Sequence, residues 1–402
     1  MLPKWQKTTL GEVITLKRGY DLSAKNRKQG RVPVITSSGI SGYHSEAKIK
    51  GPGVITGRYG NIGSIFFCET DYWPHNTTLY VKDFKNNYPQ FVYYLLHTIN
   101  FESYNDKAAV PGINRNHLHM AEVEIPDFYT QKEIAKILSS FDDKIELNRK
   151  MNATLEQIAQ TIFKSWFVDF DPVKAKAAGR EPEGMDAETA ALFPSEFEQS
   201  ELGMIPKGWK VGSFGQMFNF TMGQSPPGET YNENREGIVF YQGRADFGFR
   251  YPTPRIYCFA PMRLAQEGET LLSVRAPVGD INMSMERCCI GRGLASIIHK
   301  SGSCSYTFYK MKYLEKELAS FNGEGTVFGS ISKTTLSEVK IKEPSKNLVF
   351  VFEKLVSGID KKIKTLSQEM INLVSLRDSL LPRLISGQLR IPDVENTLGD
   401  LL

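Results

Sequence analysis

The chain has 402 residues, of which 41% are hydrophobic and 23% are charged, as in an ordinary globular protein of two or three domains. Its five cysteines are odd in number and form no CxxC pair, which argues against a disulfide framework and favours a reduced, cytoplasmic setting. No apolar run approaches the roughly 20 residues of a membrane helix, and residues 1–5 lack the apolar core of a signal peptide.

The net charge of +4 is unevenly distributed. Residues 173–201 contain three basic and seven acidic side chains, which leaves a net charge of +8 for the rest of the chain. A moderately basic body with an acidic connector suits a polyanionic partner.

Residues 1–130 predict a mixed α/β domain. Short apolar runs bounded by turn residues predict strands, and a helix is expected at 91–99. Glycines crowd the stretch 39–63, which indicates a loop-rich surface of the kind that usually carries binding specificity. The predicted strands are 11–16, 32–36, 53–56, 64–67 and 77–81.

A long helix is predicted for 131–171, because apolar residues recur every seven positions and form the seam of a coiled coil. Thr130 and Glu133 predict a capping box at its start, and Pro172 predicts its end. The polar residue in the row is expected to fix the register at some cost in stability. The seam row is Ile134, Phe141, Asn148, Leu155 and Ile162.

A connector at 172–208, with a short helix at 187–192, leads to a second α/β domain at 209–344. A second long helix follows at 345–389, and a tail at 390–402 ends the chain. Every seam position of the second helix lies 218 residues after its counterpart in the first. This second row is Phe352, Ile359, Leu366, Leu373 and Leu380.

The offset extends beyond the helices, so the chain contains a long internal repeat. Ile113 and Leu118 return as Ile331 and Leu336 at the same offset, and the opening Trp5 returns as Trp209 at an offset of 204. The predicted fold is therefore α+β, with two α/β domains joined by two long helices. A pseudo-two-fold axis would make the helices antiparallel and place one domain at each end, although spacing alone leaves a parallel pair open.

The repeat suggests a partner, because duplex DNA has two-fold character of its own. Two diverged readers in one chain predict an asymmetric, split DNA site, with the helices as the spacer. Arg, Asn and Gln pair with base edges, and Lys and Arg contact phosphates. Candidates in the first domain are Lys17, Arg18, Lys25, Arg27, Arg58, Tyr59, Asn61, Asn114 and Arg115. Those in the second are Gln242, Arg244, Arg275, Arg292 and Lys333, and for each residue an ordinary solvated surface is the alternative.

The sequence indicates no catalytic site or metal site. It has no P-loop, and residues 224–228 only partly match the Asn/Asp-Pro-Pro-aromatic loop of amino-methyltransferases. Asp142 and Lys144 resemble part of a magnesium nuclease site, but both recur in the second helix, so a solvated or partner-facing helix surface explains them better. His117 and His119 alternate as in a strand and have no third ligand.

The chain resembles the specificity subunit of type I restriction–modification systems over nearly its whole length. The resemblance rests on the following features. They are the two-copy layout, Ser165–Pro172 (SWFVDFDP), Gly203–Trp209 (GMIPKGW), Gly223–Pro226 (GQSP) and Leu376–Leu389 (LRDSLLPRLISGQL). The second copy departs from the family pattern at Val349, where the first copy has Gln131.

The resemblance implies two target recognition domains, each reading half of a bipartite site on double-stranded DNA. The helices would dock two methyltransferase subunits, which bind S-adenosylmethionine and methylate adenine N6. A restriction and translocase subunit using ATP and Mg²⁺ would join for cleavage. The chain itself would have no catalytic residues, cofactor or metal. The alternatives are a self-sufficient Mg²⁺-dependent restriction nuclease and a coiled-coil scaffold that does not touch DNA.

Overall fold

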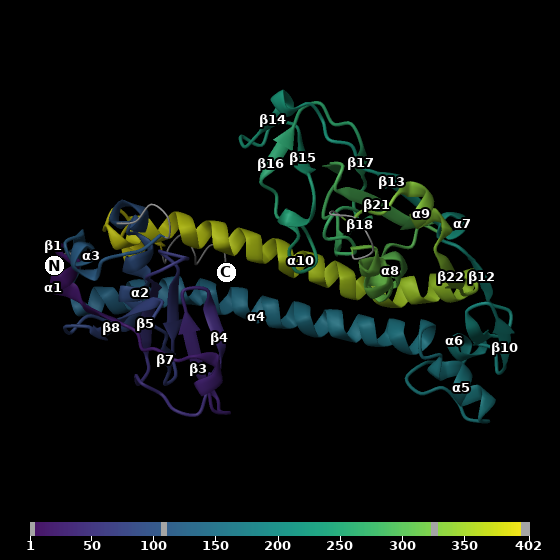
Figure 1. Ribbon diagram of the computed structural model, residues 1–402, viewed down its shortest axis with the longest axis horizontal. Coiled ribbons are helices and arrows are strands. Elements are labelled where there is room, and N and C mark those ends of the chain that lie inside the picture. Colours follow the sequence, from purple (N-terminus) through teal and green to yellow (C-terminus); the bar gives the residue numbers. More distant parts are fainter. Residues whose placement is uncertain (1–4, 106–110, 323–328, 395–402) are drawn as a thin grey trace. The chain divides into compact units, whose positions relative to one another are not determined.

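The computed structural model describes residues 5–105, 111–322 and 329–394. The chain forms two compact units: unit 1 comprises residues 1–147 and 370–402, and unit 2 comprises residues 148–369. Each unit contains one α/β domain and part of each of the two long helices, α4 (Phe128–Phe167) and α10 (Lys346–Ile385) (Figure 1). No helix in the described ranges is long and apolar enough to cross a membrane.

In unit 1 the α/β domain contains three antiparallel or mixed sheets and three short helices. The helices are α1 (Leu10–Val13), α2 (Pro89–His97) and α3 (Arg115–His119). One sheet pairs β1 (Gln6–Thr9) with β9 (Glu122–Ile125). The four-stranded sheet has the order β2 (Thr15–Arg18), β8 (Thr78–Asp83), β5 (Gly53–Gly57), β6 (Ile65–Cys68). The third has the order β4 (Gly39–His44), β3 (Val32–Thr36), β7 (Trp73–Pro74).

Unit 2 repeats this plan. Its helices are α7 (Phe214–Met217), α8 (Cys304–Ala319) and α9 (Lys333–Glu338). β12 (Lys210–Ser213) pairs with β22 (Lys340–Glu343), and the four-stranded sheet has the order β13 (Phe218–Met222), β21 (Leu294–His299), β18 (Thr270–Ser273), β19 (Ile281–Met283). The third sheet differs, with the order β14 (Tyr231–Asn232), β16 (Ile256–Cys258), β15 (Ile238–Tyr241), β20 (Cys288–Ile290), β17 (Leu264–Ala265). The two domains thus share one framework and diverge mainly in one sheet.

The long helices run antiparallel within each unit. In unit 2, Asn152 contacts Ser367 while Phe163 further along α4 contacts Phe352, so the two sequences run in opposite directions. In unit 1, Ile134 and Leu138 share a core with Leu380 and Leu384. The predicted fold class, two α/β domains joined by two long antiparallel helices, is confirmed.

The buried stripe of α4 shifts along the helix. Ile134, Phe141 and Asn148 are buried, but Leu155 and Ile162 are only partly buried. The next residues along the helix, Glu156 and Phe163, are buried in their place. Phe163 packs against Tyr306 and Tyr309 of α8. In α10, Phe352, Leu366 and Leu380 are buried, whereas Ile359 and Leu373 are partly exposed. The buried face of each long helix therefore contacts both the other long helix and the α/β domain.

Helix ends differ from the prediction in two places. The main chain N–H of Thr130 and its hydroxyl donate to Asp127 at 3.1 and 2.9 Å, so Asp127 caps α4 and the predicted capping box of Thr130 and Glu133 is wrong. Pro172 does not end α4, which stops at Phe167; it lies in the first turn of α5 (Asp171–Ala177), a position that needs no N–H donor. The end of α10 at Ile385 lies within four residues of the predicted boundary, and Gly387 takes up a left-handed φ of 73° just after it.

The connector contains the expected short helix, α6 (Ala187–Ala191), and a hairpin of β10 (Phe197–Ser200) and β11 (Gly203–Pro206). His117 and His119 lie on helix α3, so the predicted strand is wrong there. The Nε2 atom of His119 accepts a hydrogen bond from the main chain of Leu16 at 2.9 Å, which gives this side chain a structural role.

Candidate nucleic-acid interface

A cavity of about 460 Å³ in the first α/β domain gathers five of the predicted DNA-contacting residues. It lies where the end of β2, the turn after β5 and the segment 112–115 meet. Its lining is Arg18, Arg58, Tyr59, Leu79, Gly112, Ile113, Asn114 and Arg115. With Leu79 of β8, segments from four separate parts of the sequence therefore converge on one basic concave surface.

Arg58 is held in this cavity through both its backbone and its side chain. Its main-chain N–H donates to Thr77 at 2.8 Å, and its carbonyl accepts from Ile113 at 3.0 Å. Its guanidinium lies 4.4 Å from the ring centroid of Tyr59, and its Nη2 donates to the Tyr59 hydroxyl at 3.3 Å. Gly57 makes this turn possible, because a Cβ there would stand 1.9 Å from the carbonyl oxygen of Asn61. The side chain is thus fixed at the end of a sheet strand.

The other polar groups of the cavity are engaged in different ways. Arg18 donates to both carboxylate oxygens of Asp21, at 3.0 and 3.1 Å, which compensates its charge. Hydrogen bonding from Asn76, together with Arg18, lowers the pKa of Asp21. The Asn114 side chain accepts from the main-chain N–H at position 116 and caps α3. Arg115 is exposed at the start of the same helix.

The remaining first-domain candidates lie outside the lining of this cavity. Lys17 on β2 has its ammonium 5.6 Å from the ring of Tyr20. Lys25 is exposed in a 3-10 turn, Ala24–Asn26, and Arg27 donates to the carbonyl and hydroxyl of Ser41 at 2.7 and 3.1 Å. Asn61 is exposed and donates to the Ser38 hydroxyl at 3.1 Å. The predicted basic cluster is therefore divided between β2 and the β3–β4 hairpin.

The second α/β domain builds a corresponding cavity of about 680 Å³. Arg275 and Arg292 line it, together with Met222, Gly223, Val274, Ala276 and residues 329–332. Ile331 donates to the carbonyl of Val274 at 3.1 Å, as Ile113 does to Arg58, and a bridge joins Arg275 to Ser330 as another joins Tyr59 to Gly112. The same backbone construction therefore frames both cavities.

Three loops meet beside this second cavity. The Ser225 hydroxyl donates to the Gln242 side-chain carbonyl at 3.0 Å and accepts from the Arg292 N–H at 3.3 Å. Gly223 permits the approach, since a Cβ there would lie 2.2 Å from the carbonyl oxygen of Gly291. The Gly223–Pro226 motif thus positions two predicted residues, Gln242 and Arg292.

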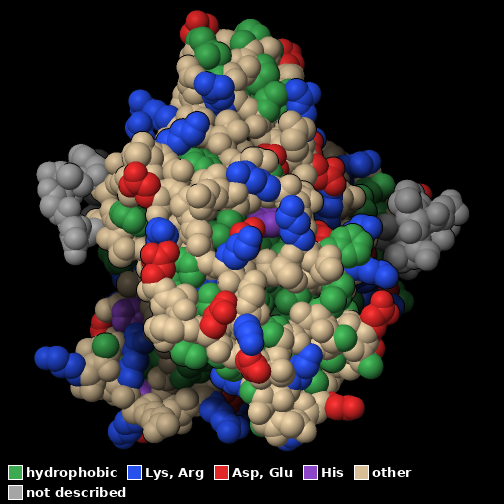
Figure 2. All heavy atoms as spheres, turned by 90° about the vertical axis from the view of Figure 1, so that its right-hand side faces the viewer, with side chains coloured by type: hydrophobic (Ala, Val, Ile, Leu, Met, Phe, Trp, Pro, Cys, Tyr) green, Lys and Arg blue, Asp and Glu red, His purple; other side chains and the backbone are tan. Residues whose placement is uncertain are grey.

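Two second-domain candidates differ in availability. Arg244 is paired with Asp280 at 2.5 Å, so its charge is compensated. Lys333 is exposed and follows Ser332, a lining residue of the cavity. On the face shown in Figure 2, Lys and Arg side chains are scattered among Asp and Glu and form no continuous basic patch. The cavity, rather than surface charge, marks the candidate site of the second domain.

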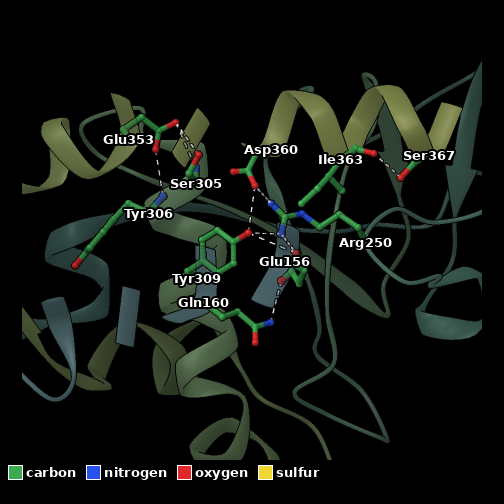
Figure 3. Close-up of polar contacts among 10 residues, drawn as sticks. All are labelled: Glu156, Gln160, Arg250, Ser305, Tyr306, Tyr309, Glu353, Asp360, Ile363 and Ser367. Atoms are coloured by element: carbon green, nitrogen blue, oxygen red, sulfur yellow. Dashed lines mark hydrogen bonds and ion pairs between the residues drawn. The ribbon is translucent and has the colours of Figure 1, made fainter. Parts of the chain in front are cut away.

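Asp142 and Asp360, expected on a solvated or partner-facing helix surface, are the points where each α/β domain is attached to the helices. Asp142 accepts from the Tyr94 hydroxyl at 2.6 Å and from Arg377 at 2.5 Å. Asp360 accepts from the Tyr309 hydroxyl at 3.2 Å and from Arg250 at 2.5 Å (Figure 3). Each carboxylate is partly buried against a tyrosine of the neighbouring domain helix, so the solvated surface, one of the two expected settings, is not what the structure has.

Arg250 completes this attachment in unit 2 and was missed in the sequence. Its guanidinium is fully buried, lies 3.7 Å from the ring centroid of Phe308 and donates to Glu156 at 2.5 Å (Figure 3). It therefore joins α4, α8 and α10 through a single side chain. Arg250 stands in a loop without periodicity, so no local pattern marks it.

A second attachment point explains the departure at Val349. In unit 1 the Gln131 side chain accepts from the main-chain N–H of Tyr88, at the start of α2. In unit 2, Glu353 on α10 accepts from the main-chain N–H groups of Ser305 and Tyr306, in the first turn of α8 (Figure 3). Burial raises the pKa of Glu353. Glu353, one turn beyond Val349, therefore takes over the capping role of Gln131.

Comparison with known proteins is consistent with this duplicated plan. The family model of the type I restriction modification DNA specificity domain matches residues 3–157 and 206–369. A putative type I restriction enzyme MjaX specificity subunit from Methanocaldococcus jannaschii is 32% identical over 75% of this chain and 68% of its own length. The type I restriction enzyme HindI specificity subunit from Haemophilus influenzae is 29% identical over 75% of this chain and 77% of its own length.

A solved structure shares the fold. The S subunit of a type I restriction-modification system from M. genitalium matches with a TM-score of 0.63 and 17% identity, over 96% of each chain. The two family-model matches correspond to the two α/β domains and the helix that follows each. The chain therefore belongs to the family of type I restriction–modification specificity subunits.

Proposed function

We propose that this chain is the DNA-addressing subunit of a type I restriction–modification complex. Each α/β domain acts as a target recognition domain that reads one half of an asymmetric, bipartite site. The helices dock two methyltransferase subunits, which supply S-adenosylmethionine and transfer its methyl group to adenine N6. A restriction and translocase subunit supplies the ATP- and Mg²⁺-dependent steps.

The observation that carries this proposal is the arginine-containing cavity that occurs once in each domain. The two cavities share a backbone frame but differ in lining, with Arg18, Tyr59 and Arg115 in the first and Met222, Ala276 and Arg292 in the second. Guanidinium groups on loops held by rigid sheets are suited to phosphates and base edges. Two unlike cavities suit two unlike half-sites.

The alternatives have less support. In the nuclease alternative Asp142 binds Mg²⁺, but both of its oxygens are occupied by Tyr94 and Arg377. In the scaffold alternative the recognition loops have no ligand, which leaves the arginine-containing cavity of each domain without a purpose.

The test is to sequence the methylated bases of cells that carry this chain with its methyltransferase subunit, beside cells that carry the methyltransferase subunit alone. We expect a split motif with a methylated adenine in each half, present only with this chain. In parallel, the assembled complex should bind duplex DNA with an affinity that falls steeply as salt rises.

An active methyltransferase without any split motif would overturn the proposal. Purified chain that cuts plasmid with Mg²⁺, and loses this activity in Asp142→Asn, would establish the nuclease alternative instead. Duplex binding that is equally strong in a double variant, Arg58→Gln with Arg275→Gln, would favour the scaffold alternative.

A further inference from the structure

We propose that Arg58 reads a guanine in the half-site bound by the first recognition domain. This inference rests on the proposed function and adds a base identity to it. The cavity contains three arginines, Arg18, Arg58 and Arg115. We assign Arg58 to a base and Arg115 to a phosphate, and the contacts of each side chain are the basis for the assignment.

Arg58 has the properties of a base reader. Its backbone is pinned on one side to Thr77 and on the other to Ile113, and its guanidinium is stacked on Tyr59 and bonded to the hydroxyl of that ring. The bond to Tyr59 uses one N–H of the fork and leaves other N–H donors for a ligand. Two parallel N–H donors of a guanidinium match the O6 and N7 acceptors of guanine, and this is the commonest specific contact to a base.

The other two guanidinium groups of the cavity are suited to other roles. Arg18 is held by both oxygens of Asp21, so a phosphate or base edge would have to compete with a carboxylate for it. Arg115 is exposed at the start of α3, where a long flexible side chain can follow a phosphate without reading sequence. Arg58 is thus the guanidinium of this cavity that is rigidly oriented and has no carboxylate partner among the described residues.

The second domain provides an internal comparison. In the backbone frame shared by the two cavities, Val274 stands where Arg58 does and Arg275 stands where Tyr59 does, so the second domain has neither an arginine nor an aromatic ring at these two places. Arg275 is also exposed, whereas Arg58 is partly buried. The rigid guanine reader is therefore specific to the first half-site, and Arg275, an exposed arginine of the second cavity, is the control.

The experiment uses the complete complex with its methyltransferase subunits. Methylation is measured on a set of duplexes in which each position of the motif is changed in turn, and on genomic DNA by sequencing. The variants are Arg58→Gln, Arg58→Lys, Tyr59→Leu, Arg115→Gln and Arg275→Gln. Unfolding midpoints of all variants are compared, and the conservative Arg58→Lys substitution keeps the test valid if Arg58→Gln fails to fold.

We expect one G·C pair in the first half-site at which Arg58→Gln lowers discrimination by about 5- to 150-fold, with other positions unchanged. Arg58→Lys loses the two-donor match and should also relax this position, and Tyr59→Leu should relax it partly. Arg115→Gln should weaken binding uniformly across sequences and reduce the salt dependence by about one phosphate contact. Arg275→Gln should leave the first half-site unchanged.

Two results would overturn the inference while leaving the proposed function intact. One is a split motif whose affected half contains no G·C pair. The other is a uniform loss of methylation in Arg58→Gln at all sequences, which would identify Arg58 as a phosphate contact. Absence of any split motif is a different outcome, because it removes the proposed function as well.

Discussion

Arg250 is the most demanding polar group of unit 2, because a fully buried guanidinium is stable only when its charge and donors are matched. Glu156 and Asp360 supply the charges, and Tyr309 accepts one further bond at 3.0 Å. Even so, Oδ2 of Asp360 is buried without a hydrogen-bond partner. The attachment of the second α/β domain to the long helices therefore depends on Arg250, because replacing it alone would leave two carboxylates without a countercharge.

Replacing Arg250 with Met should destabilise unit 2 by about 3–5 kcal/mol, because two carboxylates would remain near the core without a countercharge. Urea unfolding of the full chain, with hydrogen exchange to assign the loss to unit 2, measures this effect. The exposed pair of Lys364 and Glu267 is the control, and Lys364→Met should cost less than about 1 kcal/mol.

A triple variant tests whether the uncompensated carboxylates cause the loss of stability. Arg250→Met with Glu156→Gln and Asp360→Asn removes all three charges, so much of the lost stability should return. A single Arg250→Met variant as stable as the parent would show that the cluster does not hold the domain.

At the scale of elements, the sequence pattern predicted what depends on periodicity. The strand at 32–36 coincides with β3, the strands at 53–56 and 77–81 differ from β5 and β8 by one or two residues at their ends, and both long helices form where the seven-residue rows predicted a helix. The expected strand at 11–16 is instead the helix α1 followed by β2. An apolar run this short does not distinguish a helical turn from a strand.

The features that escaped prediction depend on contacts between distant segments. Asp127 caps α4 by accepting a hydrogen bond from Thr130. Asp142 accepts a hydrogen bond from Tyr94, which is 48 positions away in the sequence, so no local pattern could predict this contact. The cavity residues Arg18, Arg58 and Arg115 were each predicted by residue type, but their convergence depends on the sheet order. Residue chemistry suggested the candidates, and the fold selected among them.

The helix seam of unit 2 contains two buried amides. Asn148 donates to Glu369 at 3.0 Å and Asn152 donates to the Ser367 hydroxyl at 3.1 Å, but the side-chain carbonyl of each asparagine is buried without a partner. Polar residues in such a seam favour one register at a cost in stability. The seam is therefore tuned for alignment rather than for maximal stability.

Asn152→Leu should raise the stability of unit 2 by about 1 kcal/mol, because it removes a buried unsatisfied carbonyl. Ser367 is not left unpaired, since its hydroxyl also donates to the carbonyl of Ile363 at 2.7 Å. Thermal unfolding measures the change, and Met151→Leu on the exposed side of the same helix should have little effect. A lower melting temperature for Asn152→Leu would mean that the amide contributes more than its unpaired carbonyl costs.

At the scale of the whole molecule, each unit is assembled from distant parts of the sequence. Unit 2 contains the second half of α4, the connector, the second domain and the first part of α10. Its core brings Ala159, Phe163 and Trp166 of α4 against Phe352 and Val356 of α10. Burial of several large aromatic side chains contributes of the order of 1.5–3 kcal/mol each, so this core should survive a break in the chain.

A break in the connector tests this conclusion. Gly179 and Gly184 have left-handed φ values of 70° and 74°, and a Cβ at either position would meet no atom within 4 Å, so a protease site fits between them. After cutting, we expect the two fragments to elute together on native size-exclusion chromatography and to separate only in denaturant. A scrambled, uncut site is the control, and Phe163→Ala in the cut chain should weaken the association because Phe163 contacts Tyr306, Tyr309 and Phe352. Unit 1 also combines residues of both fragments, so fragments that separated without denaturant would show that neither core holds without the covalent connection.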